Sequence, residues 1–168
     1  MGKKSTKENK NVYQISREEA GLTRSQASEL MPGISESRIE KIEYGTTYAQ
    51  PEDIVAMAEA YKKPYLCNHY CANECRIGQD FVPEVKISSL AEISLGILSS
   101  LNALDKQKER LIDITADGKI TDDELPDFID IQKNLEQISL TIDSFKLWLN
   151  NTILSGDINK EKLDSLRK

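Results

Sequence analysis

The chain has 168 residues, 39% of them hydrophobic, which is enough to bury a core and excludes a wholly disordered protein. It has no apolar run long enough to span a membrane and no secretory signal at its start, so we expect a cytoplasmic protein without a membrane partner. The net charge of −6 arises mainly after residue 80. The nearly neutral first half does not exclude nucleic acid, although it lacks the basic surplus typical of nucleic-acid binding.

The first part of the chain predicts a tail and then a series of short helices. Residues 1–11 are polar and rich in lysine, and we expect a flexible basic tail there. Glycine and proline divide the next residues into short segments, and Thr23 and Ser35 stand where N-caps belong. Helices are expected at residues 12–20, 24–31, 36–44 and 51–61. No segment alternates polar and apolar residues with period two, so the expected fold class is all-α.

Two stretches of this region carry a family resemblance. They read GLTRSQASELMPGISESRIEKIEYG, residues 21–45, and QPEDIVAMAEAYKKP, residues 50–64. Together they resemble the Xre/Cro-type helix-turn-helix transcriptional regulators of bacteria and phages. The resemblance implies a lambda-repressor-like helix-turn-helix DNA-binding domain over residues 12–64, with double-stranded operator DNA as its partner. It also implies a structural role for Glu43 inside the domain.

The segment at residues 36–44 would be the recognition helix. Successive helical residues are about 100° apart, so placing Ile39 and Ile42 in the core turns Ser37, Glu40, Lys41 and Tyr44 outward. Lysine, serine and glutamate side chains can all contact base edges in the major groove. Phosphate contacts would supply most of the affinity, with Lys62, Lys63 and the lysine tail among their sources. The expected DNA-binding residues are Arg24, Ser25, Ser35, Glu36, Ser37, Arg38, Glu40, Lys41, Tyr44, Thr46 and Thr47.

The residues at 65–86 look less regular and predict a joint between two domains. They contain all three cysteines, Cys67, Cys71 and Cys75, within nine residues, so the chain has no disulfide framework. Two interpretations stay open for this thiol cluster. The cysteines are either buried structural residues of the joint, or a redox pair or soft-metal site.

From residue 87 the pattern changes to long helices. Leu90, Ile93, Ile97, Leu101 and Leu104 form one apolar stripe, and a second runs through Phe128, Ile131, Leu135, Ile138, Ile142, Phe145 and Leu149. Two stripes joined by a short loop predict an antiparallel hairpin. A hairpin has little interior, so residues 87–168 are expected to form a helical dimerisation or signal domain, with coiled-coil packing and a homodimer. A monomeric three-helix bundle closed by a last helix near 159–167 is the alternative.

The loop between the two stripes reads DITADGKITDDEL and has two interpretations. One is an EF-hand-like calcium loop, with a glycine at the bend and a neutral hydroxyl at its third position. The other is a capping box, in which Glu124 follows Thr121 by three residues at the start of the second long helix. The calcium ligands would be Asp113, Thr115, Asp117, Lys119, Thr121 and Glu124.

These observations predict an all-α, sequence-specific DNA-binding transcriptional regulator that acts as a dimer. Its fold would be a lambda-repressor-like helix-turn-helix domain followed by a helical hairpin or small bundle. The sequence contains no nucleophile motif and no phosphate-binding glycine loop, so neither an enzymatic activity nor a cofactor is expected. The alternative function is a protein-interaction module, either an antirepressor or a modulator of a host factor, that uses the same fold without reading an operator.

Overall fold

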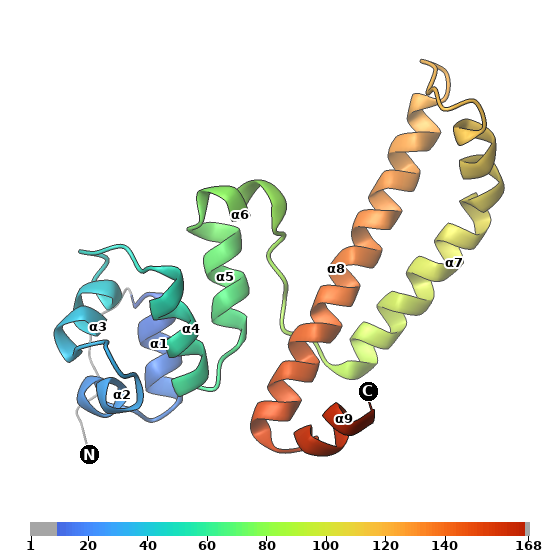
Figure 1. Cartoon of the computed structure of the whole chain (residues 1–168). Coiled ribbons are helices and arrows are strands. Elements are labelled where there is room, and N and C mark those ends of the chain that lie inside the picture. The colour runs from blue at the N-terminus through green and yellow to red at the C-terminus, as the bar shows by residue number, and fades with distance from the viewer. Residues whose placement is uncertain (1–9, 167–168) are drawn as a thin grey trace. The chain divides into compact units, whose positions relative to one another are not determined.

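The structure, a computed structural model, describes residues 10–166, and every regular element in that range is an α-helix (Figure 1). This confirms the prediction of an all-α fold. Residues 85–149 form one compact unit, and the chain on either side is assigned to a second unit. Each is described by itself. No helix in the described range is long and apolar enough to cross a membrane.

The N-terminal region contains six short helices. Asn11, Thr23 and Ser35 cap the first three, each through a side-chain oxygen that accepts a hydrogen bond from a backbone N–H of the first turn. Pro51 occupies the first turn of the fourth, where its missing N–H is not needed. The helices are α1 (Val12–Glu19), α2 (Arg24–Leu30), α3 (Glu36–Glu43), α4 (Pro51–Ala60), α5 (Tyr65–Asn73) and α6 (Arg76–Phe81). The first four lie within a residue of the ranges that the sequence predicts.

Lys10 and Asn11, which the sequence places at the end of the predicted tail, make defined contacts. Lys10 pairs with Glu18 at 2.6 Å, and the Asn11 side chain donates a hydrogen bond of 2.8 Å to the Ile42 carbonyl. Asn11 therefore connects the start of α1 to α3. The prediction for residues 1–9 lies outside the described residues.

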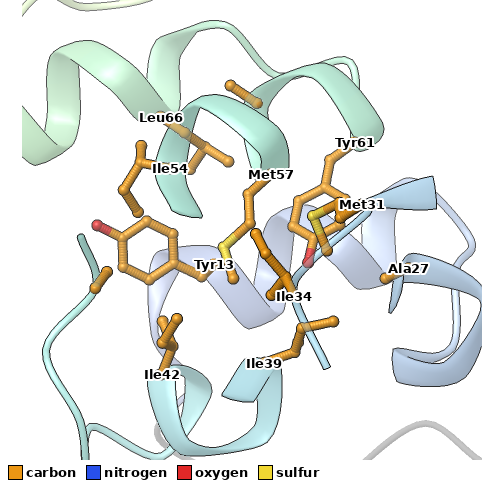
Figure 2. Close-up of a cluster of buried hydrophobic side chains, with 12 residues drawn as sticks. Tyr13, Ala27, Met31, Ile34, Ile39, Ile42, Ile54, Met57, Tyr61 and Leu66 are labelled. Atoms are coloured by element: carbon orange, nitrogen blue, oxygen red, sulfur yellow. The ribbon is translucent and has the colours of Figure 1, made fainter. Parts of the chain in front are cut away.

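One hydrophobic core holds these helices together, and Figure 2 shows its side chains converging from α1, α2, α3, α4 and α5. Ile39 and Ile42 of α3 are buried in it, together with Met57 of α4. Burying a large aliphatic side chain contributes roughly 1.5–3 kcal/mol. The core fixes which side of α3 faces inward. Its members are Tyr13, Ala27, Met31, Ile34, Ile39, Ile42, Ala49, Ile54, Met57, Ala58, Tyr61 and Leu66.

Helices α5 and α6 extend this domain beyond residue 64. The sequence predicts a less regular joint at 65–86, but residues 65–81 are mostly helical and Leu66 is fully buried in the core. The hydroxyls of Ser16 and Tyr65 are hydrogen-bonded at 2.6 Å, and the Tyr13 hydroxyl donates to Glu74 at 2.5 Å. Burial and that bond raise the pKa of Tyr13 above its usual value.

Two contacts that involve cysteines hold α6 against α5. The Cys75 side chain caps α6, since its sulfur accepts a hydrogen bond from the Gly78 N–H at 3.5 Å. A Cβ added to Gly78 would come within 2.0 Å of the Cys71 carbonyl oxygen, so only glycine permits this approach of the two backbones. The cysteine region is therefore a packing element of the first domain.

The unit formed by residues 85–149 contains most of a hairpin of two long helices, which Figure 1 shows side by side: α7 (Leu90–Thr115) and α8 (Leu125–Ser155). Asn134 donates a hydrogen bond of 2.6 Å to Gln107, and Arg110 pairs with Asp127 at 2.6 Å. A short helix, α9 (Lys160–Leu166), follows and is not part of the unit formed by residues 85–149.

The two predicted stripes are only partly covered in the chain itself. Ile93 and Ile131 are buried, but Leu101, Leu135, Ile142 and other stripe members stay exposed. The small polar residues Ser100 and Thr141 are buried as well, together with the apolar Ile114 and Leu147. Several residues of the two stripes therefore lie outside the contact between α7 and α8.

The loop between α7 and α8 contains one of the two contacts of the predicted capping box, the hydrogen bond from the Thr121 N–H to the Glu124 side chain. The backbone N–H and the hydroxyl of Thr121 donate hydrogen bonds of 3.0 and 2.7 Å to the Glu124 carboxylate. The Asp117 carboxylate accepts from the Lys119 N–H at 2.9 Å, and Gly118 adopts a positive φ of 72° at the bend. Side chains proposed as calcium ligands are thus engaged in ending one helix and starting the next.

Candidate nucleic-acid interface

Helix α3 lies in the orientation that the sequence predicts. Ile39 and Ile42 are buried, whereas Ser37, Lys41 and Tyr44 are exposed. The polar face of α3 is therefore the outer surface of the domain. Ser35, Glu36, Ser25 and Thr46 are exposed near it. An exposed recognition helix is the geometric requirement for insertion into a major groove.

A buried ion pair holds the end of α3 against α1. Arg17 donates two hydrogen bonds to Glu43, from Nε to Oε1 at 2.6 Å and from Nη2 to Oε2 at 2.9 Å. Arg17 also donates to the Leu22 carbonyl at 2.6 Å. Bidentate arginine–carboxylate pairs are directional as well as strong. The structural role that the family resemblance implies for Glu43 agrees with this geometry.

Arg24 connects that buried pair to the exposed face. Its Nε donates to Glu43 at 2.8 Å and its Nη1 donates to Glu40 at 2.7 Å, while its guanidinium lies 4.9 Å from the centre of the Tyr44 ring. Burial alone lowers the pKa of Arg24, but hydrogen bonds with Tyr44 and Glu43 raise it above its usual value. Arg24 therefore stays charged and compensates two of the glutamates of α3.

Arg38 is paired with α4 and is not a free cation beside the reading face. Its Nε and Nη2 donate to the two carboxylate oxygens of Asp53 at 2.7 and 2.5 Å. Asp53 also accepts a hydrogen bond of 2.8 Å from the Gln50 N–H, so it caps α4 while it holds α3. The two arginines predicted to contact DNA thus both have carboxylate partners within the domain.

Lys41 is the cation of α3 that remains available. It is exposed, and within residues 10–166 it makes no ion pair. Its carbonyl accepts a hydrogen bond of 3.1 Å from the Thr46 hydroxyl, which ties the loop after α3 to the helix. Lys41 is consequently the side chain of α3 best able to meet a base edge or a phosphate.

The other predicted phosphate contacts are only partly available. Lys63 pairs with Glu19 at 2.7 Å, and Lys62 has a positive φ of 55° directly after α4. The lysines of residues 1–9 lie outside the described residues. Ser35 is engaged as the N-cap of α3, and Thr47 is half-buried.

Sequence reasoning missed two residues of this region. Arg17 lies four positions after Tyr13, on the same buried side of α1, and a charged residue at such a position is the signal of an internal ion pair. Tyr48 follows Thr46 and Thr47 in the loop after α3 and is 87% exposed. An exposed tyrosine there can donate a hydrogen bond to a phosphate.

The thiol cluster does not form a metal centre with its neighbours. Within the described part of the chain, no group of three or more histidine, cysteine, aspartate or glutamate side chains is arranged to hold a metal ion. Burial raises the pKa of the Cys67 thiol, and the neighbouring Cys71 acts in the same direction. A thiol with a raised pKa is a poor nucleophile and a poor metal ligand near neutral pH.

Comparison with protein families gives a match to the helical region described above. Residues 14–64 match the family described as a helix-turn-helix domain, which covers less than a third of the 168 residues. The matched range begins in α1 and ends after α4, so it includes the whole α2–turn–α3 unit. Comparison of the chain with curated proteins and with solved structures gave no match. The N-terminal region contains a helix-turn-helix domain.

Proposed function

We propose that the protein is a sequence-specific transcriptional regulator of the Xre/Cro type, which binds double-stranded operator DNA as a dimer. The observation that carries this proposal is the exposed polar face of α3, on which Ser37 and Lys41 lie free of the ion pairs that fix the helix. The family match supports the DNA-binding class. Such a protein acts in the cytoplasm, where its DNA target lies.

Recognition would combine three side chains of α3 with different chemistry. Lys41 can donate to guanine, and Ser37 can donate or accept. Glu40 can accept from the amino group of cytosine, because a carboxylate has more acceptor positions than the single one that Arg24 occupies. The ion pairs behind these residues keep α3 rigid, so little conformational freedom is lost on binding.

Dimerisation follows from the modest charge of the interface. Arg24 and Arg38 are compensated within the domain, so one copy offers few unpaired cations to the phosphates. Two copies on a two-part operator double those contacts and read two half-sites about one helical turn apart.

The test is binding of the full chain to random double-stranded oligonucleotides, followed by selection of the bound sequences and gel shift at two salt concentrations. A regulator should enrich one motif and lose affinity as salt increases. Lys41→Ala should weaken binding to that motif, whereas Lys146→Ala on α8 serves as a matched loss of one positive charge and should not. If the wild-type chain enriches no sequence, operator reading is wrong and the protein-interaction alternative takes its place.

A further inference from the structure

The hairpin of α7 and α8 exposes large apolar residues along both helices. In each helix an apolar residue comes one position after a residue of the seam: Leu101 follows Ser100, Leu135 follows Asn134, and Ile142 follows Thr141. One position turns a helix by about 100°. Because the two helices are antiparallel, the same turn on each leads to the same face of the hairpin.

These residues form one patch, which we call the apolar face. Its members are between 38% and 53% exposed, except Ile97, which is half-buried. A contiguous exposed patch of large apolar side chains marks an interaction site on most proteins. The apolar face consists of Leu90, Ile97 and Leu101 of α7 with Leu135, Ile142 and Phe145 of α8.

The apolar face occupies only one half of the hairpin. Gly96 lies opposite Thr141, and Gln107 is hydrogen-bonded to Asn134, so residues 135–145 of α8 lie beside residues of α7 that precede Gln107. The other half carries the acidic residues of the loop and its borders: Asp113, Asp117, Asp122, Asp123, Glu124, Asp127 and Asp130, against Arg110, Lys119 and Lys133. The acidic excess of the hairpin thus lies mainly at its loop end, where apolar residues such as Ile112 and Ile129 are also exposed.

We propose that the apolar face binds the same face of a second copy of this chain, with the two hairpins antiparallel in a four-helix bundle. The inference rests on the proposed function, in which the protein acts as a dimer, and it specifies the surface. A face that is apolar and carries little charge is complementary to itself under a twofold axis. The acidic residues around the loop between α7 and α8 would repel an acidic partner. A basic partner would be attracted to that loop, which lies at the other end of the hairpin from the apolar face.

The charge distribution selects the antiparallel arrangement. Overlap of the two apolar halves directs the acidic loops away from each other, whereas a parallel arrangement would place them side by side. Like charges within about 10 Å repel at ordinary ionic strength. In the antiparallel dimer, association therefore depends mainly on burial of apolar side chains.

Trp148 provides a probe of this surface. It is the single tryptophan of the chain, and its ring stacks on that of Phe145 at 5.9 Å between centroids. Covering Phe145 with a second copy should change the environment of Trp148, so its emission should depend on protein concentration.

The experiment measures the dimer dissociation constant of the full chain by sedimentation and by Trp148 emission. Leu101→Glu places a charge within the apolar face, at its most exposed member, and should raise the dissociation constant at least about tenfold. The matched control is Leu95→Glu on the same helix. Leu95 is 68% exposed and comes one position before Gly96 of the seam, so it lies on the other face of the hairpin and its substitution should leave the dimer intact.

Circular dichroism of both variants establishes that the helices are still formed. A wild-type chain that stays monomeric, or equal weakening by the two substitutions, overturns the proposed surface. Strong tightening of the dimer by added salt overturns the antiparallel arrangement, because only adjacent acidic loops would need screening. A wild-type dimer that depends on Leu101 but enriches no DNA sequence would keep this surface and reject operator reading.

Discussion

Arg17 and Glu43 form a bidentate ion pair between α1 and the end of α3, with the Glu43 side chain completely buried. Replacing Glu43 with alanine would leave the buried guanidinium of Arg17 without its partner and remove one contact of Arg24. Removing one partner of such a pair costs about 3–5 kcal/mol. We expect Glu43→Ala to lower the free energy of unfolding by about that amount in urea.

The control for this prediction is Glu40→Ala, which also removes a carboxylate from Arg24. The Glu40 side chain is 47% exposed, and exposed pairs contribute about 1 kcal/mol or less. Equal destabilisation by the two substitutions would contradict the assignment of the structural role to Glu43.

Glu40→Ala also tests the reading of DNA. If Glu40 accepts a hydrogen bond from a cytosine, the motif selected by the variant should lose its preference at one position of each half-site while the rest is retained. Loss of such a contact corresponds to about 1–3 kcal/mol of discrimination. Comparison of the sequences selected by wild type and variant gives the answer, and identical motifs would show that Glu40 does not face a base.

The approach of α6 to α5 predicts a strong effect at Gly78. A methyl group there would meet the backbone of Cys71, which cannot move as a flexible side chain would. We expect Gly78→Ala to lower stability by about 1–3 kcal/mol and to increase hydrogen exchange in α6. In Gly96→Ala the added carbon would meet the side chain of Thr141 at 3.2 Å, and helix propensity favours alanine, so this control should change stability much less.

The pKa of Asp53 predicts how the stability of the fold changes with pH. Burial raises its pKa, but hydrogen bonds from Arg38 and the Gln50 N–H outweigh this and lower the pKa below its usual value. A carboxyl group whose pKa is lower in the folded state stabilises the fold above its unfolded pKa of about 3.9, and the contribution disappears as pH falls through the folded value.

We therefore expect Asp53→Asn to be less stable than wild type near neutral pH. The difference should shrink below about pH 4, as the wild-type carboxyl group is protonated. Urea unfolding over a pH series measures both effects, and Glu36→Gln on the exposed side of α3 should follow the wild-type curve. A difference that stays constant with pH would show that charge on Asp53 is not the cause.

The calcium-site interpretation and the helix-capping interpretation of the loop between α7 and α8 predict different experimental results. Thr121 donates two hydrogen bonds to Glu124, and loss of an N-cap costs about 1 kcal/mol. Thr121→Ala should lower the melting temperature, and millimolar calcium should not change that of the wild type. A calcium-dependent rise would restore the EF-hand interpretation.

The helix-turn-helix domain could be predicted closely because its signals are local. Glycine, proline and N-cap residues mark helix ends directly, and the spacing of Ile39 and Ile42 orients α3. Ion pairs are different, because they depend on the distance between side chains far apart in sequence. Nothing near Arg38 in the sequence indicates that Asp53, fifteen residues later, accepts hydrogen bonds from its Nε and Nη2.

The same limitation explains the wrong prediction at residues 65–86. Tyr65, Leu66 and Tyr70 carry no clear amphipathic period within α5, because that helix packs on several neighbours at once. On α8 the heptad spacing was visible, but which stripe residues face α7 depends on the partner helix. Ser100 and Thr141 are buried among apolar residues such as Ile114 and Ile131, and small polar residues at buried positions give no periodic apolar signal.

Arg24 donates hydrogen bonds both to Glu43, whose side chain is buried, and to Glu40, which lies on the surface that we propose faces DNA. If Glu40 is exchanged, Glu43 still retains the guanidinium, so the fold tolerates the change. If α3 reads an operator as we propose, a substitution at position 40 can change the preferred sequence without a compensating mutation in the core.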